Sequence, residues 1–225
     1  MSAYWSNYNL KMIKISENLI KYNNKNKISA FEKGHYNHTR DLLAISIAFL
    51  NKKNKKINIL DYGSNIASLS NLQNKIDLRN LNFNIFDPYN LNTKFKKPIK
   101  KINVKIVNNK KEFINQKFDL LHFGSCIQYQ DNFFNEFKTR LHKLSKFILI
   151  THTPFSSKGN YKSRQKNHRN LIQNIYSLKK IENLFKKNKF NLIFKSRNDD
   201  KYIACVSNKY KSYSLNLLFK KCKTI

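Results

Sequence analysis

Acidic residues, cysteine, glycine and proline are all scarce in this sequence. Its 225 residues hold 13 acidic side chains against 44 basic ones, for a formal net charge of +31, and only four glycines and three prolines. The three cysteines, Cys126, Cys205 and Cys222, are odd in number and widely spaced. That spacing excludes a disulfide framework and a cysteine-based zinc site, and it predicts a reducing compartment.

Long apolar runs are missing as well. The longest, Leu42 to Leu50, is far shorter than the roughly 20 residues that a membrane-spanning helix requires. The N-terminal residues lack the apolar core of a signal peptide. We therefore expect a cytoplasmic protein, and we predict no metal site.

The positive charge has two interpretations. Arginine is confined to a few positions, so nearly all of the excess is lysine, and it accompanies abundant Asn and Ile. This composition is typical of an A+T-rich coding sequence and predicts a solvated lysine coat. The alternative is a nucleic-acid surface, although arginine makes the better bidentate contacts to phosphate and guanine.

The hydrophobic pattern changes along the chain. Residues 1–55 place apolar side chains at helical spacing and predict a helical N-terminal extension, with one helix over 40–53. From Ile57 onward, short apolar strands alternate with amphipathic helices. The expected strands are 57–63, 82–87, 103–107, 118–124, 146–152, 190–196 and 201–207, and the expected helices include 132–144 and 177–189.

Strands that alternate with helices predict an α/β, Rossmann-like fold with a doubly wound, mostly parallel sheet of seven strands. The last two strands are separated only by a short polar turn at 197–200, so we expect an antiparallel C-terminal hairpin. The expected organisation is one α/β domain over 56–210, followed by an exposed basic tail over 211–225.

Two of the four glycines, Gly63 and Gly124, directly follow the first and fourth strands. In doubly wound sheets, ligands bind beyond the carboxyl ends of the strands, at the switch point that these two strands flank. The pair therefore predicts a close approach between backbone and ligand. The alternative is that each glycine forms an ordinary strand-to-helix turn.

An acid, Asp61, stands two residues before Gly63. A dinucleotide site has further glycines and no preceding acid, because its loop must cradle a negative pyrophosphate; here Asn65 and Ala67 stand instead. A carboxylate at this place favours a cationic ligand without phosphate, and S-adenosylmethionine, with an ammonium and a sulfonium, fits. Asp87 ends the second strand and is suited to accept both ribose hydroxyls.

These segments resemble the class I S-adenosylmethionine-dependent methyltransferases over about residues 57–207. The resemblance lies in ILDYGSNIAS (59–68), IFDP (85–88) and FDLLHFGSCIQYQDN (118–132). The sequence looks most like a little-characterised bacterial group of predicted methyltransferases that are often encoded beside surface-polysaccharide genes. The resemblance implies a methyltransferase domain over 56–210 and a small-molecule or glycan acceptor.

The resemblance also assigns cofactor-binding residues. They are Asp61, Gly63, Ser64, Asn65, Asp87, Asn108, Gly124 and Ser125. Two of them depart from the family's pattern, since Asn65 stands where glycine is usual and Asn108 follows the third strand in place of an acid that meets the adenine amino group. Asn tolerates left-handed backbone better than most residues do. Ser125 is equally interpreted as a helix cap.

His152, after the fifth strand, is the candidate general base. An imidazole has an ordinary pKa of about 6.5 and can remove a hydroxyl proton; the alternative is that His152 caps the strand or binds a loop carbonyl. Gln128, Thr153 and Arg164 are candidate substrate contacts, and we expect 153–170 to form a basic, mobile loop over the site. His122, inside the fourth strand, is expected to be a buried structural histidine.

The predicted function is S-adenosylmethionine-dependent O-methylation of a small-molecule or glycan acceptor. One alternative is an RNA methyltransferase, motivated by the charge. The other is a non-catalytic binding module with the same fold, motivated by Asn65 and by the missing adenine acid.

Overall fold

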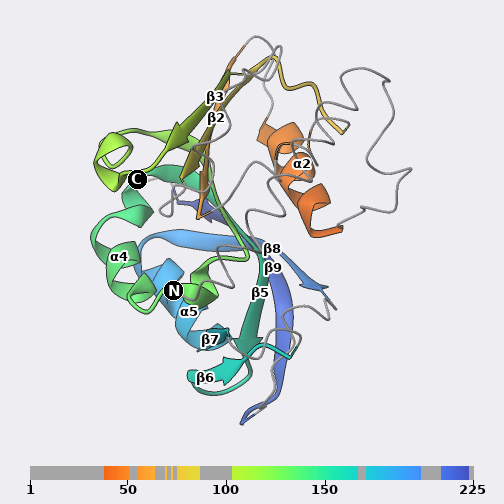
Figure 1. Ribbon diagram of the computed structural model, residues 1–225, viewed down its shortest axis with the longest axis vertical. Helices are drawn as coiled ribbons and strands as arrows, with labels where there is room; N and C mark the ends of the chain where they lie inside the picture. The colour runs from red at the N-terminus through yellow and green to blue at the C-terminus, as the bar shows by residue number, and fades with distance from the viewer. Residues whose placement is uncertain are drawn as a thin grey trace. The chain divides into compact units, whose positions relative to one another are not determined.

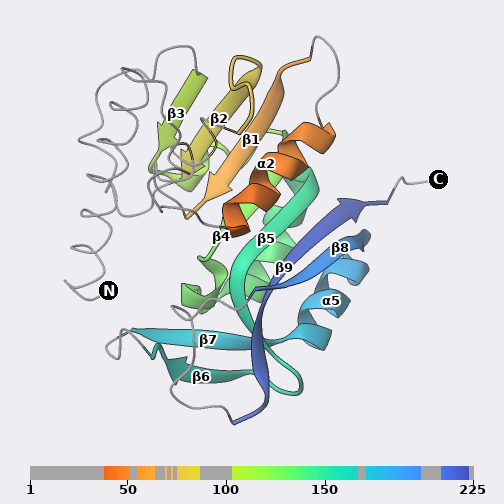
Figure 2. The same ribbon diagram turned by 90° about the vertical axis from the view of Figure 1, so that its right-hand side faces the viewer.

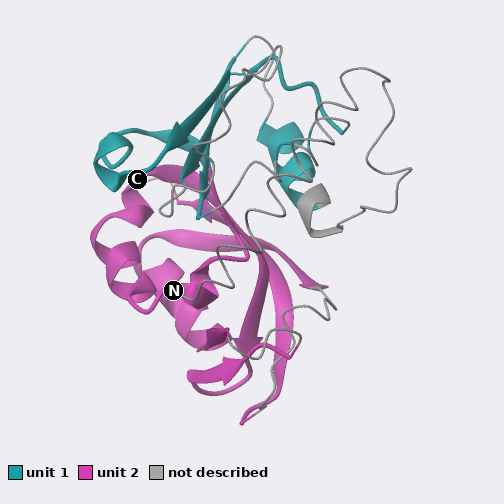
Figure 3. Cartoon of the chain, in the orientation of Figure 1, with its two compact units in different colours: residues 1–120 teal, residues 121–225 magenta. Residues whose placement is uncertain are grey.

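The computed structural model describes residues 38–50, 55–63, 69, 72, 75–86, 103–166, 171–198 and 209–222. The chain divides into two compact units, residues 1–120 and residues 121–225 (Figure 3). Nine strands form within these ranges, where seven are expected from the sequence. None of the helices in this described part is long and apolar enough to cross a membrane.

Unit 1 is built on three parallel strands. β1 (Ile57–Tyr62) pairs with β2 (Leu81–Phe86), and β2 pairs with β3 (Asn103–Val107). β1 is buried along nearly its whole length, as expected for a parallel strand covered on both faces. α2 (His38–Leu50) lies over one face of this unit's strands (Figure 1) and buries Leu43.

A ladder of asparagines pins the register of these three strands. The amide of Asn82 donates to Asn58 Oδ1 at 2.7 Å, and the amide of Asn103 donates to Asn82 Oδ1 at 2.9 Å. The backbone N–H of Asn58 donates to Asp119 Oδ2 at 3.0 Å. Because the three asparagines are register partners, each side-chain bond holds its strand against a slip.

Unit 2 is built around one long strand. β5 (Ser145–Ser156) pairs antiparallel with β9 (Ser212–Lys221), which also pairs antiparallel with β8 (Phe190–Asn198). On its other side β5 pairs in parallel with β7 (Ile172–Ser177), whose antiparallel partner is β6 (Tyr161–Arg164). Figure 2 shows β8, β9 and β5 side by side, with the β6–β7 pair at one end. β4 (Phe118–Gly124) leads from unit 1 into unit 2.

The helices of unit 2 pack through phenylalanines. The segment expected as one helix over 132–144 forms α4 (Phe133–Thr139) and a short 3-10 turn, η4 (Leu141–Lys143), since the chain leaves helical geometry at Arg140. The expected helix over 177–189 is α5 (Leu178–Lys187). Ring centroids lie 4.2 Å apart between Phe137 and Phe185, and 3.9 Å apart between Phe185 and Phe219.

Those ring contacts show that the predicted C-terminal tail was wrong. Within 211–225, residues 212–221 form β9 between β5 and β8, and Phe219 belongs to the core of unit 2. The strand expected over 201–207 lies outside the described residues. The C-terminal antiparallel pair therefore exists as expected, with β9 as the partner of β8.

Candidate active site

At the end of β1, a buried acid precedes a left-handed turn. The side chain of Asp61 has an exposed fraction of 0 %. Gly63 has a φ of 70°, which strains any residue that carries a Cβ, and its N–H donates to the carbonyl of Phe86 at 2.9 Å. The end of β1 therefore carries a buried carboxyl group two residues before a turn that favours glycine.

The neighbouring strands end level with β1. Tyr62, Phe86 and Val107 are register partners, so Asn108 follows β3 at the same edge. The side chain of Asn108 is exposed. Next to it, Asn109 caps the 3-10 turn η2 (Lys110–Glu112) by accepting from the N–H of Lys111 at 2.9 Å.

Aromatic rings fill unit 1 beside this edge. The ring centroids of Tyr62 and Phe86 are 4.8 Å apart, and those of Phe86 and Phe113 are 5.0 Å apart. Lys110 Nζ lies 5.9 Å from the centroid of Tyr62, within the reach of a cation–π contact. Three predicted cofactor contacts, Ser64, Asn65 and Asp87, lie outside the described residues and stay predictions.

In unit 2, the residues after β4 are held by the carbonyl of Thr151. The N–H of Ser125 donates to Thr151 O at 2.9 Å while Ser125 takes a φ of 56°. Gln128, on the 3-10 turn η3 (Ile127–Tyr129), donates to Ser125 Oγ at 2.9 Å. Gln128 has an exposed fraction of 0 %, and its Oε1 has no hydrogen-bond partner among the described residues.

Gly124 leaves no room for a side chain. Gly63 alone among the described glycines has a positive φ. A Cβ on Gly124 would lie 2.8 Å from Cε1 of His122, inside van der Waals contact. The buried His122 is fixed by a 2.9 Å hydrogen bond between its Nε2 and Thr151 Oγ1, which confirms the expectation of a structural histidine.

His152 does not end its strand. β5 continues to Ser156, and its register against β9 shifts between Ile150 and Thr153, so Thr151 and His152 together oppose Asn216. This is the arrangement of a β-bulge. His152 is half-buried with a φ of 57°, and its N–H donates to Asn216 Oδ1 at 3.0 Å.

The predicted substrate contacts are only partly brought together. Thr153 is buried and its hydroxyl donates to Thr151 O at 3.1 Å, so it belongs to the same network as Ser125. Arg164 is instead exposed at the end of β6, where it pairs with Ile172. The loop predicted over 153–170 was wrong for its described part, which contains the end of β5 and all of β6.

The β6–β7 hairpin is tied to the segment after η3. Asp131 accepts hydrogen bonds from Lys162 at 2.8 Å and from Asn174 at 3.2 Å, and these bonds hold the pKa of its carboxyl below the ordinary value. The hydroxyl of Tyr176 donates to the carbonyl of Gln130. Burial, and then the nearby charge of Asp131, raise the pKa of Tyr176.

Sequence reasoning missed Asn216 and Ser196. Asn216 is 4 % exposed, and its amide donates to Ser196 Oγ on β8 at 3.2 Å. A signal was present, because Asn216 interrupts an apolar run that continues through Leu217 and Leu218. A buried polar residue in such a run needs a hydrogen-bond partner. In the described part of the chain, no group of three or more His, Cys, Asp or Glu side chains is arranged to hold a metal.

The fold is similar to that of solved methyltransferase structures. The 1,6-didemethyltoxoflavin-N1-methyltransferase of Burkholderia thailandensis, with its ligand and S-adenosylhomocysteine bound, aligns at a TM-score of 0.55 with 11 % identity, over 93 % of this chain and 88 % of that one. Magnesium protoporphyrin IX methyltransferase of Synechocystis PCC 6803, with S-adenosylmethionine bound, aligns at a TM-score of 0.54 with 12 % identity, over 82 % and 78 % of the two chains.

The glycopeptide N-methyltransferase MtfA, complexed with S-adenosylmethionine, aligns at a TM-score of 0.50 with 7 % identity, over 84 % of this chain and 96 % of that one. No family model matches the sequence, and no curated protein matches it. At these identities the likeness is one of fold. It confirms the predicted fold class, an α/β Rossmann-like arrangement with a mostly parallel sheet and a C-terminal antiparallel strand pair.

Proposed function

We propose that this protein is a methyltransferase that uses S-adenosylmethionine to O-methylate a small-molecule or glycan acceptor. Two findings support the proposal: the likeness of fold to solved methyltransferases, and the chemistry of the β1 end. The observation that carries it is the buried carboxylate of Asp61, two residues before the left-handed turn at Gly63. A carboxylate at this place attracts a cationic ligand, and the ammonium group of S-adenosylmethionine is such a cation.

The residues present fit this cofactor. Asp61 and Gly63 would hold its amino acid end, and Asn108, at the level edge of the same unit, offers an amide to a nucleobase. Ser64, Asn65 and Asp87 complete the proposed set in unit 1. The sequence resemblance adds Gly124 and Ser125 to the proposed set of cofactor contacts.

When bound, S-adenosylmethionine supplies a methyl group that is already activated on a positively charged sulfur. The protein's main task is then to hold the acceptor in line, and proximity of this kind contributes on the order of 7–11 kcal/mol. The acceptor hydroxyl must lose its proton, and we assign that proton to the imidazole of His152. Gln128 Oε1, a buried acceptor atom, would receive a hydrogen bond from the acceptor and orient it.

The acceptor class is proposed from the similar structures, from His152 and from the sequence resemblance. The three similar enzymes are named for methylating 1,6-didemethyltoxoflavin, magnesium protoporphyrin IX and a glycopeptide. This fold therefore accommodates different acceptors. We prefer a hydroxyl acceptor because His152 provides a base. The resemblance to a bacterial group encoded beside surface-polysaccharide genes points to a glycan and to polysaccharide biosynthesis.

Isothermal titration of the full chain with S-adenosylhomocysteine tests the proposal. We expect saturable binding with one ligand per chain. ATP is the matched control, because it shares the adenosine group but carries phosphates that Asp61 would repel. Both titrations should be run at about 0.3 M salt, where weak attraction of phosphates to a protein of net charge +31 is screened. A folded chain that does not bind S-adenosylhomocysteine would overturn the proposal.

The charge favours RNA as a second candidate acceptor. An RNA methyltransferase would transfer labelled methyl groups from S-adenosylmethionine to RNA, and its RNA affinity would fall steeply with salt. Comparing RNA with the glycan and metabolite fractions of one cell extract decides between the two acceptor classes.

A further inference from the structure

The bulge in β5 places a residue with a side chain in left-handed backbone. His152 has a φ of 57°, a conformation that few residues other than glycine adopt. Unit 2 contains another irregular strand for comparison. In β8 the register shifts between Leu192 and Phe194, and the extra residue, Ile193, does not take a positive φ. A shifted register alone therefore does not force left-handed backbone.

The difference at His152 is the side chain that faces it. Asn216 uses both halves of its amide: Oδ1 accepts from the N–H of His152 at 3.0 Å, and the amide nitrogen donates to Ser196 Oγ at 3.2 Å. These two bonds join β5, β9 and β8 at one level, where Asn216 and Ser196 are register partners. Since Asn216 is buried, loss of either bond would leave a polar group without a partner.

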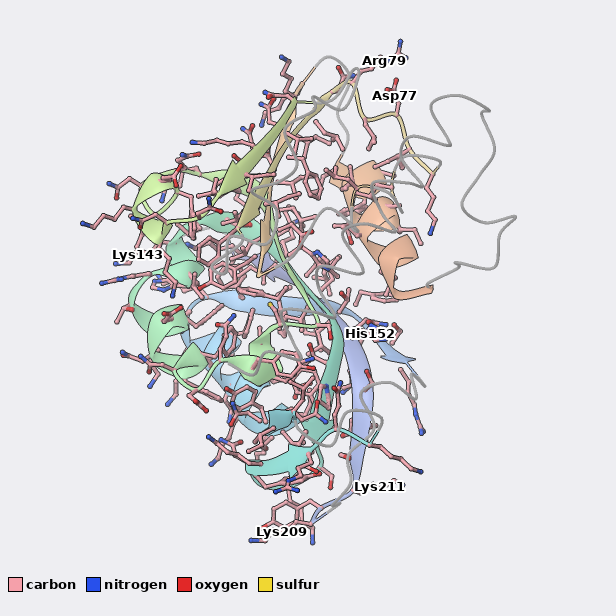
Figure 4. All side chains as sticks on the ribbon, in the orientation of Figure 1. Asp77, Arg79, Lys143, His152, Lys209 and Lys211 are labelled. Atoms are coloured by element: carbon pink, nitrogen blue, oxygen red, sulfur yellow. The ribbon has the colours of Figure 1, made fainter. Side chains whose placement is uncertain are left out.

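We propose that Asn216 is a positioning residue that fixes the bulge of β5 and thereby the direction in which the His152 imidazole projects. The role of this positioning in methyl transfer rests on the proposed function, in which His152 is the base. The positioning itself does not depend on the cofactor. Figure 4 labels His152 beside β5.

The imidazole of His152 provides a direct readout in the full-length chain. Its Cε1–Hε1 signal in a carbon-edited NMR spectrum is assigned by its loss in His152→Gln. Asn216→Leu removes both hydrogen bonds, so we expect the His152 signal to move or to split into several states. The signal of His142, whose ring bonds to the carbonyl of Phe137 outside the bulge, should stay in place.

Asn216→Asp is the rescue variant. A carboxylate keeps an oxygen for the N–H of His152, and the hydroxyl of Ser196 can turn to donate to the second oxygen. We therefore expect the His152 signal to return to its original position. Asn188→Leu is the control, because it removes a different asparagine amide of the same unit, half-buried and bonded to Leu184 O at 2.8 Å, and it should leave the His152 signal unchanged.

An unchanged His152 signal in folded Asn216→Leu overturns the proposal. So does a signal that is displaced in Asn216→Leu and stays displaced in Asn216→Asp. If Asn216→Leu fails to fold, Ser196→Ala takes its place and should displace the same signal by a smaller amount; no displacement overturns the proposal. Affinity for S-adenosylhomocysteine should stay within about twofold in every variant, because no cofactor contact is removed. Absence of binding in the unaltered chain would instead count against the proposed function and leave the NMR result standing.

Discussion

At the end of β1 the chain turns on a glycine, whereas after β4 and within β5 it turns on residues that carry side chains. Gly63 has a φ of 70°, and Ser125 and His152 have φ values of 56° and 57°. The glycine needs no side-chain partner for its conformation. Ser125 and His152 instead each donate a backbone N–H to another strand: Ser125 donates to Thr151 O, and His152 donates to Asn216 Oδ1.

The two regions also differ in charge. Unit 1 presents a buried carboxylate, Asp61, at its edge. Unit 2 presents neutral hydroxyls and amides, held in one network through Thr151. In unit 1 the left-handed glycine therefore follows a buried acid, whereas in unit 2 the left-handed backbone at Ser125 and His152 is held by neutral hydrogen-bond partners.

The largest expected effect comes from the charge. Asp61→Asn keeps the size of the side chain and removes its charge, so we expect affinity for S-adenosylhomocysteine to fall by about 10- to 100-fold, the equivalent of one charge-assisted hydrogen bond of about 1.5–3 kcal/mol. Isothermal titration measures it. Asp77→Asn is the control, since Asp77 is exposed and paired with Arg79 at 2.5 Å (Figure 4). Equal losses of affinity in the two variants would show that Asp61 has no specific role in binding the cofactor.

The next effect tests the frame of unit 2. In Gly124→Ala the added methyl group meets the ring of His122, which is buried and bonded to Thr151, so we expect a loss of about 1–3 kcal/mol in the free energy of unfolding. Urea titration measures it. Gly159→Ala is the matched control, because its methyl group would lie equally close to Tyr210, a half-exposed ring that can move aside. If Gly124→Ala loses no more stability than Gly159→Ala, the ring of His122 moves aside as easily as that of Tyr210.

A smaller effect depends on pH. Tyr176 is an acid whose pKa is raised in the folded state by burial and then by Asp131. Its contribution to stability is therefore complete below the unfolded tyrosine pKa of about 10. Above that value the contribution declines, by at most about 1.4 kcal/mol per pH unit.

Urea titrations of the unaltered chain and of Tyr176→Phe between pH 8 and pH 11 test this. The stability advantage of the unaltered chain should shrink above pH 10, and the lysines titrate equally in both proteins. A constant advantage across that range would mean that Tyr176 is not shielded from water beneath the η3 segment.

The smallest effect measures the cost of left-handed backbone at a residue that carries a side chain. Lys189 follows α5 with a φ of 64° and an exposed side chain, at a position where helices commonly end on glycine. Lys189→Gly should raise the free energy of unfolding by about 0.5–1 kcal/mol, measured by urea titration. Lys187→Gly is the control and should lower it, because Lys187 is the last residue of α5. A loss at Lys189 would show that left-handed backbone costs little in this chain.

The parallel strands of unit 1 and helix α5 were predictable from sequence, because short apolar runs and helical spacing are local signals. β9 was not, since the lysines at its end favoured a tail and its burial depends on Phe185, far away in the sequence. Asp61 and Gly63 could be predicted because the charge of the one and the missing side chain of the other are properties of the residue itself and can be read directly from the sequence. The bulge at His152 could not, because it depends on Asn216, 64 residues away.

The asparagine ladder of unit 1 has a consequence for how this protein can change over generations. Asn58, Asn82 and Asn103 lock together the starts of β1, β2 and β3. Insertions or deletions in the connections between these strands therefore leave the alignment of the strands intact. The far ends of the strands would stay level while the connecting loops vary, so the loops at those ends can lengthen without rebuilding the sheet.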